Sequence, residues 1–266
     1  MTAELPPALK QLGQNFLIDP NIVRKIVDAA ALRPDDTVLE IGPGRGALTR
    51  LLCARAARVV AVEIDPLLCT YLREVLAECR TLTLVEADAL QWPFDDLPDG
   101  TVVVANLPYY VSTPLLFRLL HERDRFARAV LMLQSEVAQR LVAQPGTKEY
   151  GVLSVMAQIQ AEARILFRVS PNCFRPRPDV ESSVISLVRR PDALPAELLG
   201  RVERVVRRAF AHRRKTLVNS LRDAGYDGMD ATVVVKGLGL ETAVRAEDVT
   251  IGQFVDLAHR LREPPG

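Results

Sequence analysis

The sequence predicts an α/β protein in which an open, mainly parallel β-sheet precedes a small C-terminal all-α domain. Three observations support this prediction. Short runs rich in Val, Ile and Leu alternate with helix-length segments as far as Arg190, which is the rhythm of βαβ units with helices on both faces of a sheet. A glycine-rich turn directly follows the first of these runs. Beyond Pro191 the strand-like runs stop, and only helical patterns remain.

Seven apolar runs are the expected strands: Thr37–Ile41, Val59–Ile64, Leu82–Val85, Val102–Asn106, Ala129–Leu133, Ile165–Val169 and Val184–Val188. Their branched apolar residues are typical of strands that are buried on both faces. The last two runs are joined by the proline-rich segment Phe174–Pro178, which cannot be helical and suits an antiparallel edge of the sheet. Before the sheet, Asp19 and Pro20 predict a helix start, because an N-cap aspartate precedes proline at the first helical position.

Composition narrows the class of protein. Hydrophobic residues make up 48% and charged residues 25% of the chain, as in ordinary soluble proteins. No apolar run approaches the roughly 18 residues of a membrane span, and Met1–Lys10 lacks the apolar core of a signal peptide. The four cysteines form no C-x-x-C pair, so we expect reduced thiols in a cytoplasmic protein and no metal site. With a net charge of +1, only a local charge cluster could indicate a nucleic-acid partner.

The glycine-rich turn contains Gly42, Gly44 and Gly46 in a G-x-G-x-G spacing. Glycines permit a tight turn and a close approach of the backbone to a ligand, which lies outside the carboxyl ends of the strands in open α/β sheets. Glycine-rich turns are common in proteins, so this one alone is weak evidence. Its spacing disfavours the dinucleotide pattern G-x-G-x-x-G.

Acidic residues at the next two strand ends make the prediction specific. Glu63 ends the second strand 21 residues after Gly42, where an acid that binds ribose hydroxyls is expected. Asp88 follows the third strand and can accept a hydrogen bond from an adenine amine, whereas Asp65 before Pro66 indicates a helix cap. Together these features predict a Rossmann-like sheet of a SAM-dependent methyltransferase, with S-adenosyl-L-methionine (SAM) as the cofactor.

The fourth strand ends in the predicted catalytic residues Asn106, Leu107, Pro108 and Tyr109. The exocyclic nitrogen of adenine is a poor nucleophile because its lone pair is conjugated with the ring. The Asn106 side-chain oxygen and the Leu107 carbonyl can accept from its two N–H groups and free that lone pair, while Pro108 stiffens the loop. Tyr109 offers a flat face to an extruded base, with the ring rather than the hydroxyl as the expected contact. The alternative is an ordinary strand followed by a proline turn and a core tyrosine.

These motifs and their order resemble the ribosomal RNA adenine N6-dimethyltransferase family (KsgA-like small-subunit enzymes). The resemblance covers nearly the whole chain and is carried by these segments: Gly13–Leu17 (GQNFL), Glu40–Gly46, Glu63–Asp65, Asn106–Tyr109 with Ser112–Pro114, Tyr150–Val155, Phe174–Val180 and Arg213–Leu217. Single glycine loops occur in many families. The sequences GQNFL, NLPY and FxPxPxV in this order are highly specific.

The resemblance implies a SAM-binding methyltransferase domain at residues 1–191, with residues 1–19 contacting cofactor or RNA, and a helical RNA-binding domain at residues 192–266. The implied cofactor-binding residues are Gln14, Asn15, Leu17, Gly42, Gly44, Gly46, Glu63, Ile64, Asp88, Ala89 and Asn106. Asn106 to Tyr109 would hold the target adenine, and Phe174 would flank it. The implied substrate is two adjacent adenosines near the 3′ end of small-subunit (16S) ribosomal RNA in an assembling ribosomal particle. Each would be dimethylated by a monomeric enzyme with a role in small-subunit biogenesis.

Three alternatives stay open. The macrolide-resistance methyltransferases of large-subunit RNA share the family, but Leu107 and Pro114 favour the small-subunit enzyme. A non-catalytic ribosome-assembly or RNA-binding factor is disfavoured by the presence of both Glu63 and Asn106. A small-molecule methyltransferase would have no reason for the NLPY segment. One departure from the family is Tyr110, which stands where a second asparagine is typical.

A basic segment predicts where RNA binds. Seven Lys or Arg and a single acid, Glu203, lie between Arg201 and Lys215. Val202, Val205, Val206 and Ala209 follow the spacing of a buried helix face and leave the arginines on the other side. We expect phosphate contacts from Arg207, Arg208, Arg213, Arg214 and Lys215, extended by Lys10, Arg175 and Arg177. The alternative is a basic helix face that is merely solvated.

Overall fold

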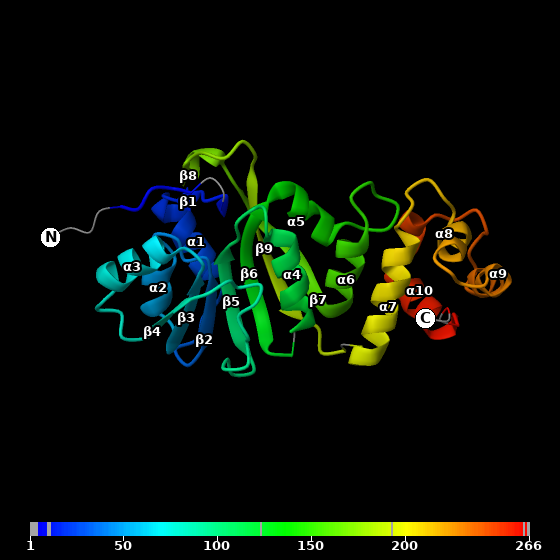
Figure 1. Cartoon of the computed structure of the whole chain (residues 1–266), viewed down its shortest axis with the longest axis horizontal. Coiled ribbons are helices and arrows are strands. Elements are labelled where there is room, and N and C mark those ends of the chain that lie inside the picture. The colour runs from blue at the N-terminus through cyan, green and yellow to red at the C-terminus, as the bar shows by residue number, and fades with distance from the viewer. Residues whose placement is uncertain (1–4, 10–11, 123, 193, 263, 265–266) are drawn as a thin grey trace. The chain divides into compact units, whose positions relative to one another are not determined.

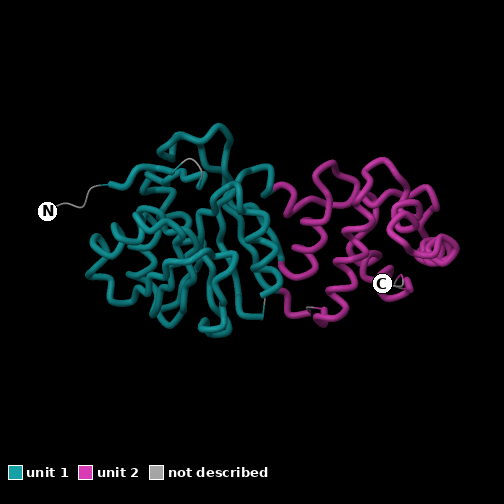
Figure 2. Tube along the Cα trace, viewed as in Figure 1, with its two compact units in different colours: residues 1–138, 162–189 teal, residues 139–161, 190–266 magenta. Residues whose placement is uncertain are grey.

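The computed structural model describes residues 5–9, 12–122, 124–192, 194–262 and 264. The chain forms two compact units, residues 1–138 with 162–189 and residues 139–161 with 190–266 (Figure 2). The first unit ends at Arg189 and the second unit continues from Arg190, close to the predicted domain boundary at residue 191. Residues 139–161, which we expected in the sheet domain, belong instead to the second unit, because α6 (Val152–Gln160) packs against α7 (Ala196–Ala209) and α10 (Ile251–Arg260).

A seven-stranded sheet with the order β4-β3-β2-β5-β6-β9-β7 forms the centre of the first unit (Figure 1). Its strands are β2 (Thr37–Ile41), β3 (Arg58–Glu63), β4 (Leu82–Glu86), β5 (Thr101–Asn106), β6 (Phe126–Gln134), β7 (Ala161–Val169) and β9 (Ser182–Arg189). The strands from β4 to β6 are parallel, and β9 is antiparallel to β6. All seven predicted strands are therefore confirmed, as is the antiparallel arrangement after the proline-rich segment.

Two further strands, β1 (Phe16–Leu17) and β8 (Phe174–Arg175), pair antiparallel in a small separate sheet. The pairing joins the N-terminal segment, which contains β1, to the proline-rich segment, which contains β8. Most of the sequence of the first unit lies between these two segments. Neither was predicted, because two residues are too few to show the alternation by which a strand is detected.

The helices of the first unit are α1 (Pro20–Ala29), α2 (Thr49–Cys53), α3 (Pro66–Val75), α4 (Ser112–His121), the start of α5 (Ser135–Val142) and the 3-10 turn η2 (Pro171–Cys173). The predicted cap of α1 is confirmed, because the Asp19 side chain accepts from the amides of Asn21 and Ile22. Asp65 caps α3 in the same way, through the Leu67 amide. These caps fix where each helix leaves the carboxyl edge of the sheet.

The second unit consists of helices, namely α6, α7, α8 (Leu217–Asp223), α9 (Gly228–Gly237), α10 and the 3-10 turn η3 (Ala246–Asp248). As predicted, α7 buries Val202, Val205, Val206 and Ala209. An aromatic cluster lies beside α7, with ring centroids 6.0 Å apart for Tyr150 and Phe210. In neither unit do the described residues form a helix that is long and apolar enough to cross a membrane.

Candidate active site

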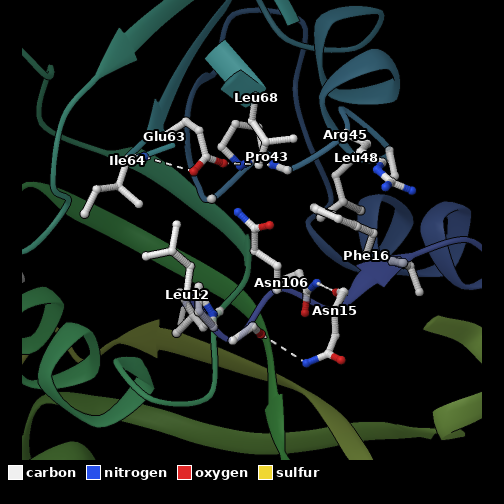
Figure 3. Close-up of a pocket in the computed structure, with 18 of the residues that line it drawn as sticks. Leu12, Asn15, Phe16, Pro43, Arg45, Leu48, Glu63, Ile64, Leu68 and Asn106 are labelled. Atoms are coloured by element: carbon white, nitrogen blue, oxygen red, sulfur yellow. Dashed lines mark hydrogen bonds between the residues drawn. The ribbon is translucent and has the colours of Figure 1, made fainter. Parts of the chain in front are cut away.

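A pocket of about 760 Å³, part of it open to solvent, lies in the first unit at the carboxyl ends of β2, β3 and β5 (Figure 3). This is the edge at which open α/β sheets bind ligands. The lining comes from three parts of the chain. They are the N-terminal segment Leu12–Leu17, the glycine loop with Gly42–Arg45, and the catalytic loop Asn106–Tyr110, joined by Glu40, Ala47, Leu48, Glu63, Ile64 and Leu68.

The glycine loop contacts the N-terminal segment closely. Gly44 has a φ of +57°, and a Cβ atom there would lie 3.1 Å from Cδ1 of Phe16, so only glycine permits this approach. Gly46, in contrast, does not line the pocket. A Cβ atom at Gly46 would lie 3.1 Å from Leu72 of α3, so the absence of a side chain here serves helix packing. The contact of Gly46 with a cofactor stays a prediction.

Glu63 is the centre of the hydrogen bonding at the pocket, although only 5% of the residue is exposed. Its Oε2 accepts from the amide of Gly44 at 3.1 Å, and its Oε1 accepts from the amide of Ile64 at 2.9 Å (Figure 3). Oε1 also accepts from the amide of Asp65 at 3.1 Å. Burial raises the pKa of Glu63, and the three amide donors oppose that shift. The carboxylate is therefore held in one place, with acceptor capacity left for a ligand's hydroxyl groups.

The N-terminal segment is tied to the rest of the pocket by polar contacts. Gln14 donates to Oδ2 of Asp65 at 2.8 Å and accepts from the Leu9 amide at 2.7 Å. Arg45 of the glycine loop donates to the Pro6 carbonyl at 2.6 Å, and its guanidinium lies 4.2 Å from the centre of the Phe16 ring. These contacts make the segment a fixed wall of the pocket.

The catalytic loop is fixed at both ends of its short length. The Asn106 side chain donates from Nδ2 to the carbonyl of Asn15 at 3.2 Å, and the Leu107 amide donates to the carbonyl of Met132 at 3.0 Å. Because an amide group is planar, the bond to Asn15 turns the acceptor Oδ1 of Asn106 away from the N-terminal segment. Tyr109 is held through its hydroxyl, which lies 2.7 Å from Oγ of Ser182.

Most predicted cofactor residues are brought together here, namely Gln14, Asn15, Leu17, Gly42, Gly44, Glu63, Ile64 and Asn106. Asp88 and Ala89 are not among the lining residues. The Asp88 carboxylate accepts from the Leu90 amide at 2.8 Å and from Gln91. It also lies near Tyr110, whose pKa is raised by burial and, to a smaller extent, by the negative charge of Asp88. Its contact with an adenine amine stays a prediction.

Phe174 does not lie where the sequence analysis placed it. We expected this ring to flank the target base, but Phe174 is fully buried and belongs to the core cluster that includes Leu17. The pairing of β8 with β1 turns the side chain inward, because alternate residues of a strand face opposite sides. In this structure Phe174 supports the N-terminal wall instead of touching a ligand.

Three residues that matter to the pocket were missed. Phe16 packs against the glycine loop, Ser182 holds Tyr109, and Glu40 lines the pocket with only 1% of the residue exposed. Oε2 of Glu40 has no hydrogen-bond partner among the described residues, and burial, aided by the nearby Glu63, raises its pKa to about 8. The available signal for Glu40 was an acidic residue inside an otherwise apolar strand.

The predicted phosphate-binding residues lie in the second unit and form what we call the basic surface: Arg207, Arg208, Arg213, Arg214 and Lys215. The last three are exposed. Part of the charge is balanced locally, since Arg207 pairs with Glu203 at 2.7 Å and Lys215 pairs with Asp223. Of the residues expected to extend this surface, Arg175 and Arg177 are exposed, and Lys10 lies outside the described residues.

Within the described part of the chain, no three His, Cys, Asp or Glu residues lie where they could hold a metal ion. The four cysteines are free thiols, of which Cys69 is buried and its pKa raised to about 11 by burial.

Comparison with known proteins matches residues 8–263 to the family model of ribosomal RNA adenine dimethylases. A ribosomal RNA small subunit methyltransferase A from Moorella thermoacetica is 43% identical over 95% of this chain and 92% of its own. One from Pelotomaculum thermopropionicum is 45% identical over 97% and 92%. Among solved structures, a dimethyladenosine transferase from Plasmodium falciparum has a TM-score of 0.80 at 26% identity, covering 91% of this chain and 95% of the other. The 23S rRNA methyltransferase ErmE has a TM-score of 0.72 at 31% identity, covering 93% and 99%.

Proposed function

Because the chain belongs to the ribosomal RNA adenine dimethylase family, we propose that it dimethylates the N6 amine of adenosines in small-subunit ribosomal RNA. The chain is an enzyme of the SAM-dependent methyltransferase class, and S-adenosyl-L-methionine is its methyl donor. The observation that carries the proposal is the Asn106 amide, oriented by the Asn15 carbonyl inside the pocket that also holds the glycine loop and Glu63. The relatives named for the small subunit favour that RNA over large-subunit RNA.

The residues of the pocket fit the methyl donor. Gly44 lets the glycine loop pack against Phe16 and donates to Glu63, and the fixed carboxylate of Glu63 can accept from ribose hydroxyls. The buried carboxyl group of Glu40, whose Oε2 has no partner among the described residues, adds a further polar group on the same wall. When bound, the donor supplies a methyl group on a positively charged sulfur, which needs no further activation.

The contribution of the chain is to place and polarise the amine. In the proposed arrangement, Oδ1 of Asn106 and the carbonyl of Leu107 each accept one N–H of the target amine. As the nitrogen attacks the methyl carbon it gains positive charge, so both hydrogen bonds strengthen in the transition state. No general base is needed for attack, because the product can lose its proton to solvent afterwards. Rate enhancement comes from in-line positioning and fixed dipoles.

Pro108 and Tyr109 complete the loop. Pro108 restricts the backbone that presents the Leu107 carbonyl, while the half-buried Tyr109 ring offers a stacking face to a base that has left its helix. In the second unit, the basic surface would bind phosphates without reading bases. The substrate we propose is two adjacent adenosines near the 3′ end of 16S RNA in an assembling particle. The enzyme would act in the cytoplasm as a monomer.

The test supplies SAM with a labelled methyl group together with assembling small-subunit particles, naked small-subunit RNA or large-subunit RNA. Digestion and mass spectrometry then locate the modified nucleosides. We expect N6,N6-dimethyladenosine at two neighbouring positions of small-subunit RNA. Label in large-subunit RNA alone would instead indicate the macrolide-resistance class, and RNA binding without any label would indicate a non-catalytic assembly factor.

A further inference from the structure

The hydrogen bond between Tyr109 and Ser182 joins two segments that lie 73 residues apart in the sequence. Tyr109 follows β5 in the catalytic loop, and Ser182 is the first residue of β9. The two hydroxyl oxygens are 2.7 Å apart, and Ser182 is fully buried. Burial raises the pKa of Tyr109, so the phenol keeps its proton at neutral pH and remains able to donate.

We propose that Ser182 is a positioning residue that fixes the angle of the Tyr109 ring and thereby docks the target base. This inference rests on the proposed function, because it assigns a purpose to the ring's orientation. A base stacked on Tyr109 takes its tilt from that ring. The exocyclic amine at the far edge of the base then moves relative to Asn106 whenever the ring turns.

The ring is held at its two ends. The backbone end is fixed by Oγ of Ser112, which donates to the Tyr109 carbonyl at 3.0 Å, and by the amide of Leu107 on Met132. The hydroxyl end is fixed by Ser182. A side chain anchored only at its backbone can still rotate about its χ1 and χ2 angles. The hydroxyl anchor removes that freedom, which suits a site that must hold groups within roughly 0.5 Å.

Ser182 is itself well placed to act as an anchor. It pairs with Gln134 at the end of the β6–β9 ladder, and the preceding residue, Glu181, accepts from the Ser135 amide at 3.0 Å. Ser182 is therefore held by the backbone at the point where the chain leaves the proline-rich segment and enters the sheet. The proline-rich segment thus affects the catalytic loop through Ser182. The ring of Phe174, which we expected beside the base, takes no part in this contact.

The proposal changes one expectation from the sequence. If only the ring of Tyr109 mattered, Tyr109→Phe would keep most activity. With the hydroxyl as an anchor, Tyr109→Phe and Ser182→Ala remove the same hydrogen bond from opposite ends. Each variant should lower the single-turnover methylation rate by about tenfold, the scale of one lost hydrogen bond. The double variant should be no slower than either single variant, because the shared interaction is lost only once.

Ser183→Ala is the matched control. Ser183 is the next residue of β9, is 1% exposed, and pairs its hydroxyl with that of Ser135 at 2.8 Å. It faces the opposite side of the strand, so this variant loses an equivalent buried hydroxyl pair without touching Tyr109. We expect a rate within about twofold of wild type and a similar loss of thermal stability in both serine variants.

Two measurements separate positioning from a general structural effect. RNA carrying the fluorescent base 2-aminopurine at the target position reports stacking, which should weaken in Ser182→Ala and Tyr109→Phe but not in Ser183→Ala. SAM affinity by calorimetry should be unchanged in all three variants. Tyr109→Phe keeps the experiment informative even if Ser182→Ala fails to fold, because the half-buried ring stays in place.

Equal rates for Ser182→Ala and Ser183→Ala, or multiplicative losses in the double variant, would overturn the positioning role. Wild-type activity in Tyr109→Phe would also overturn it. These outcomes differ from a failure of the proposed function, which would appear as an inactive wild-type enzyme on small-subunit RNA or as full activity in Tyr109→Ala.

Discussion

In the pocket of the first unit the polar side chains are held by several partners, whereas the basic surface of the second unit is largely exposed. Glu63 accepts from three amides and Asn106 donates to a fixed carbonyl. Arg213 and Arg214 extend into solvent, with a carbonyl contact of Arg213 to Lys148 at 3.3 Å. We therefore propose that the pocket acts through geometry and the basic surface through charge.

This difference follows from what each region has to recognise. Methyl transfer to a weak nucleophile depends on small displacements, so its groups must be held before the substrate arrives. Phosphate binding depends on charge that acts over several ångströms and adds up over many contacts. Substitutions in the pocket should therefore cause large and specific losses, and substitutions on the basic surface should cause graded ones.

The largest effect is expected for Asn106→Ala. Losing an acceptor that strengthens in the transition state should slow methyl transfer by on the order of a hundredfold or more, measured in single turnovers. RNA affinity should change little, since phosphate contacts dominate it. Asn21→Ala, at an exposed asparagine of α1, serves as the control. A rate near wild type in Asn106→Ala would remove this residue from the mechanism.

The next effect concerns Glu63→Ala, which removes the buried carboxylate at the end of β3. SAM binding should weaken by about 2–3 kcal/mol, the scale of a lost hydrogen bond to a charged group, as measured by calorimetry. Glu86→Ala is the matched control, because Glu86 ends the neighbouring strand β4 but is exposed and pairs with Arg73 at 3.1 Å. If both variants bind SAM like wild type, Glu63 has no role in the cofactor site.

A graded effect is expected on the basic surface. Replacing Arg213, Arg214 and Lys215 by alanine should weaken RNA binding and lower the log–log salt slope by up to about one unit per lost contact. Lys215 should contribute least, because Asp223 already neutralises it. SAM affinity should not change. An unaltered slope would mean that this surface is only solvated, and Arg164→Ala, at an exposed arginine of β7, controls for loss of charge elsewhere.

The smallest effect tests the one unpartnered acid of the pocket. The pKa of Glu40 is about 8 in the folded chain against 4.5 for an ordinary glutamate, so between these values the folded state holds a proton that the unfolded state has lost. The free energy of unfolding therefore falls as pH rises through this window, by on the order of 1 kcal/mol between pH 6.5 and 7.5. Glu40→Gln should remove this slope in denaturant titrations. An identical slope in both proteins would show that Glu40 is charged at neutral pH.

Most of the fold could be predicted from the sequence, because strands and helix caps are indicated by residues that are neighbours in the chain. Buried parallel strands and the Asp19 and Asp65 caps depend on neighbouring residues, and each is found where it was predicted. The burial of Phe174 and the membership of α6 in the second unit depend on contacts between distant segments. The mainly apolar sequence of the helix Val152–Gln160 indicates that the helix is buried, but not against which partner.

The same distinction between local signals and distant contacts applies to the residues of the candidate site. Residue types at strand ends indicated Glu63 and Asn106, since their chemistry is visible in the sequence. The supporting side chains were not indicated. Phe16 packs against the glycine loop and Ser182 holds Tyr109, and both are ordinary residue types whose importance comes from these contacts. The packing of Gly46 against Leu72 could not be predicted either, because a helix-packing glycine and a ligand-facing glycine look the same in a motif.

The bond from Asn106 to the carbonyl of Asn15 has a consequence for protein design. Grafting the four residues Asn106–Tyr109 onto another sheet would transfer the chemical groups but not the orientation of the amide. A working graft would have to bring three separate stretches: the loop itself, the N-terminal wall that ends in β1, and the entry to β9 with Ser182. The smallest transplantable unit of this activity is thus a set of contacts among distant segments.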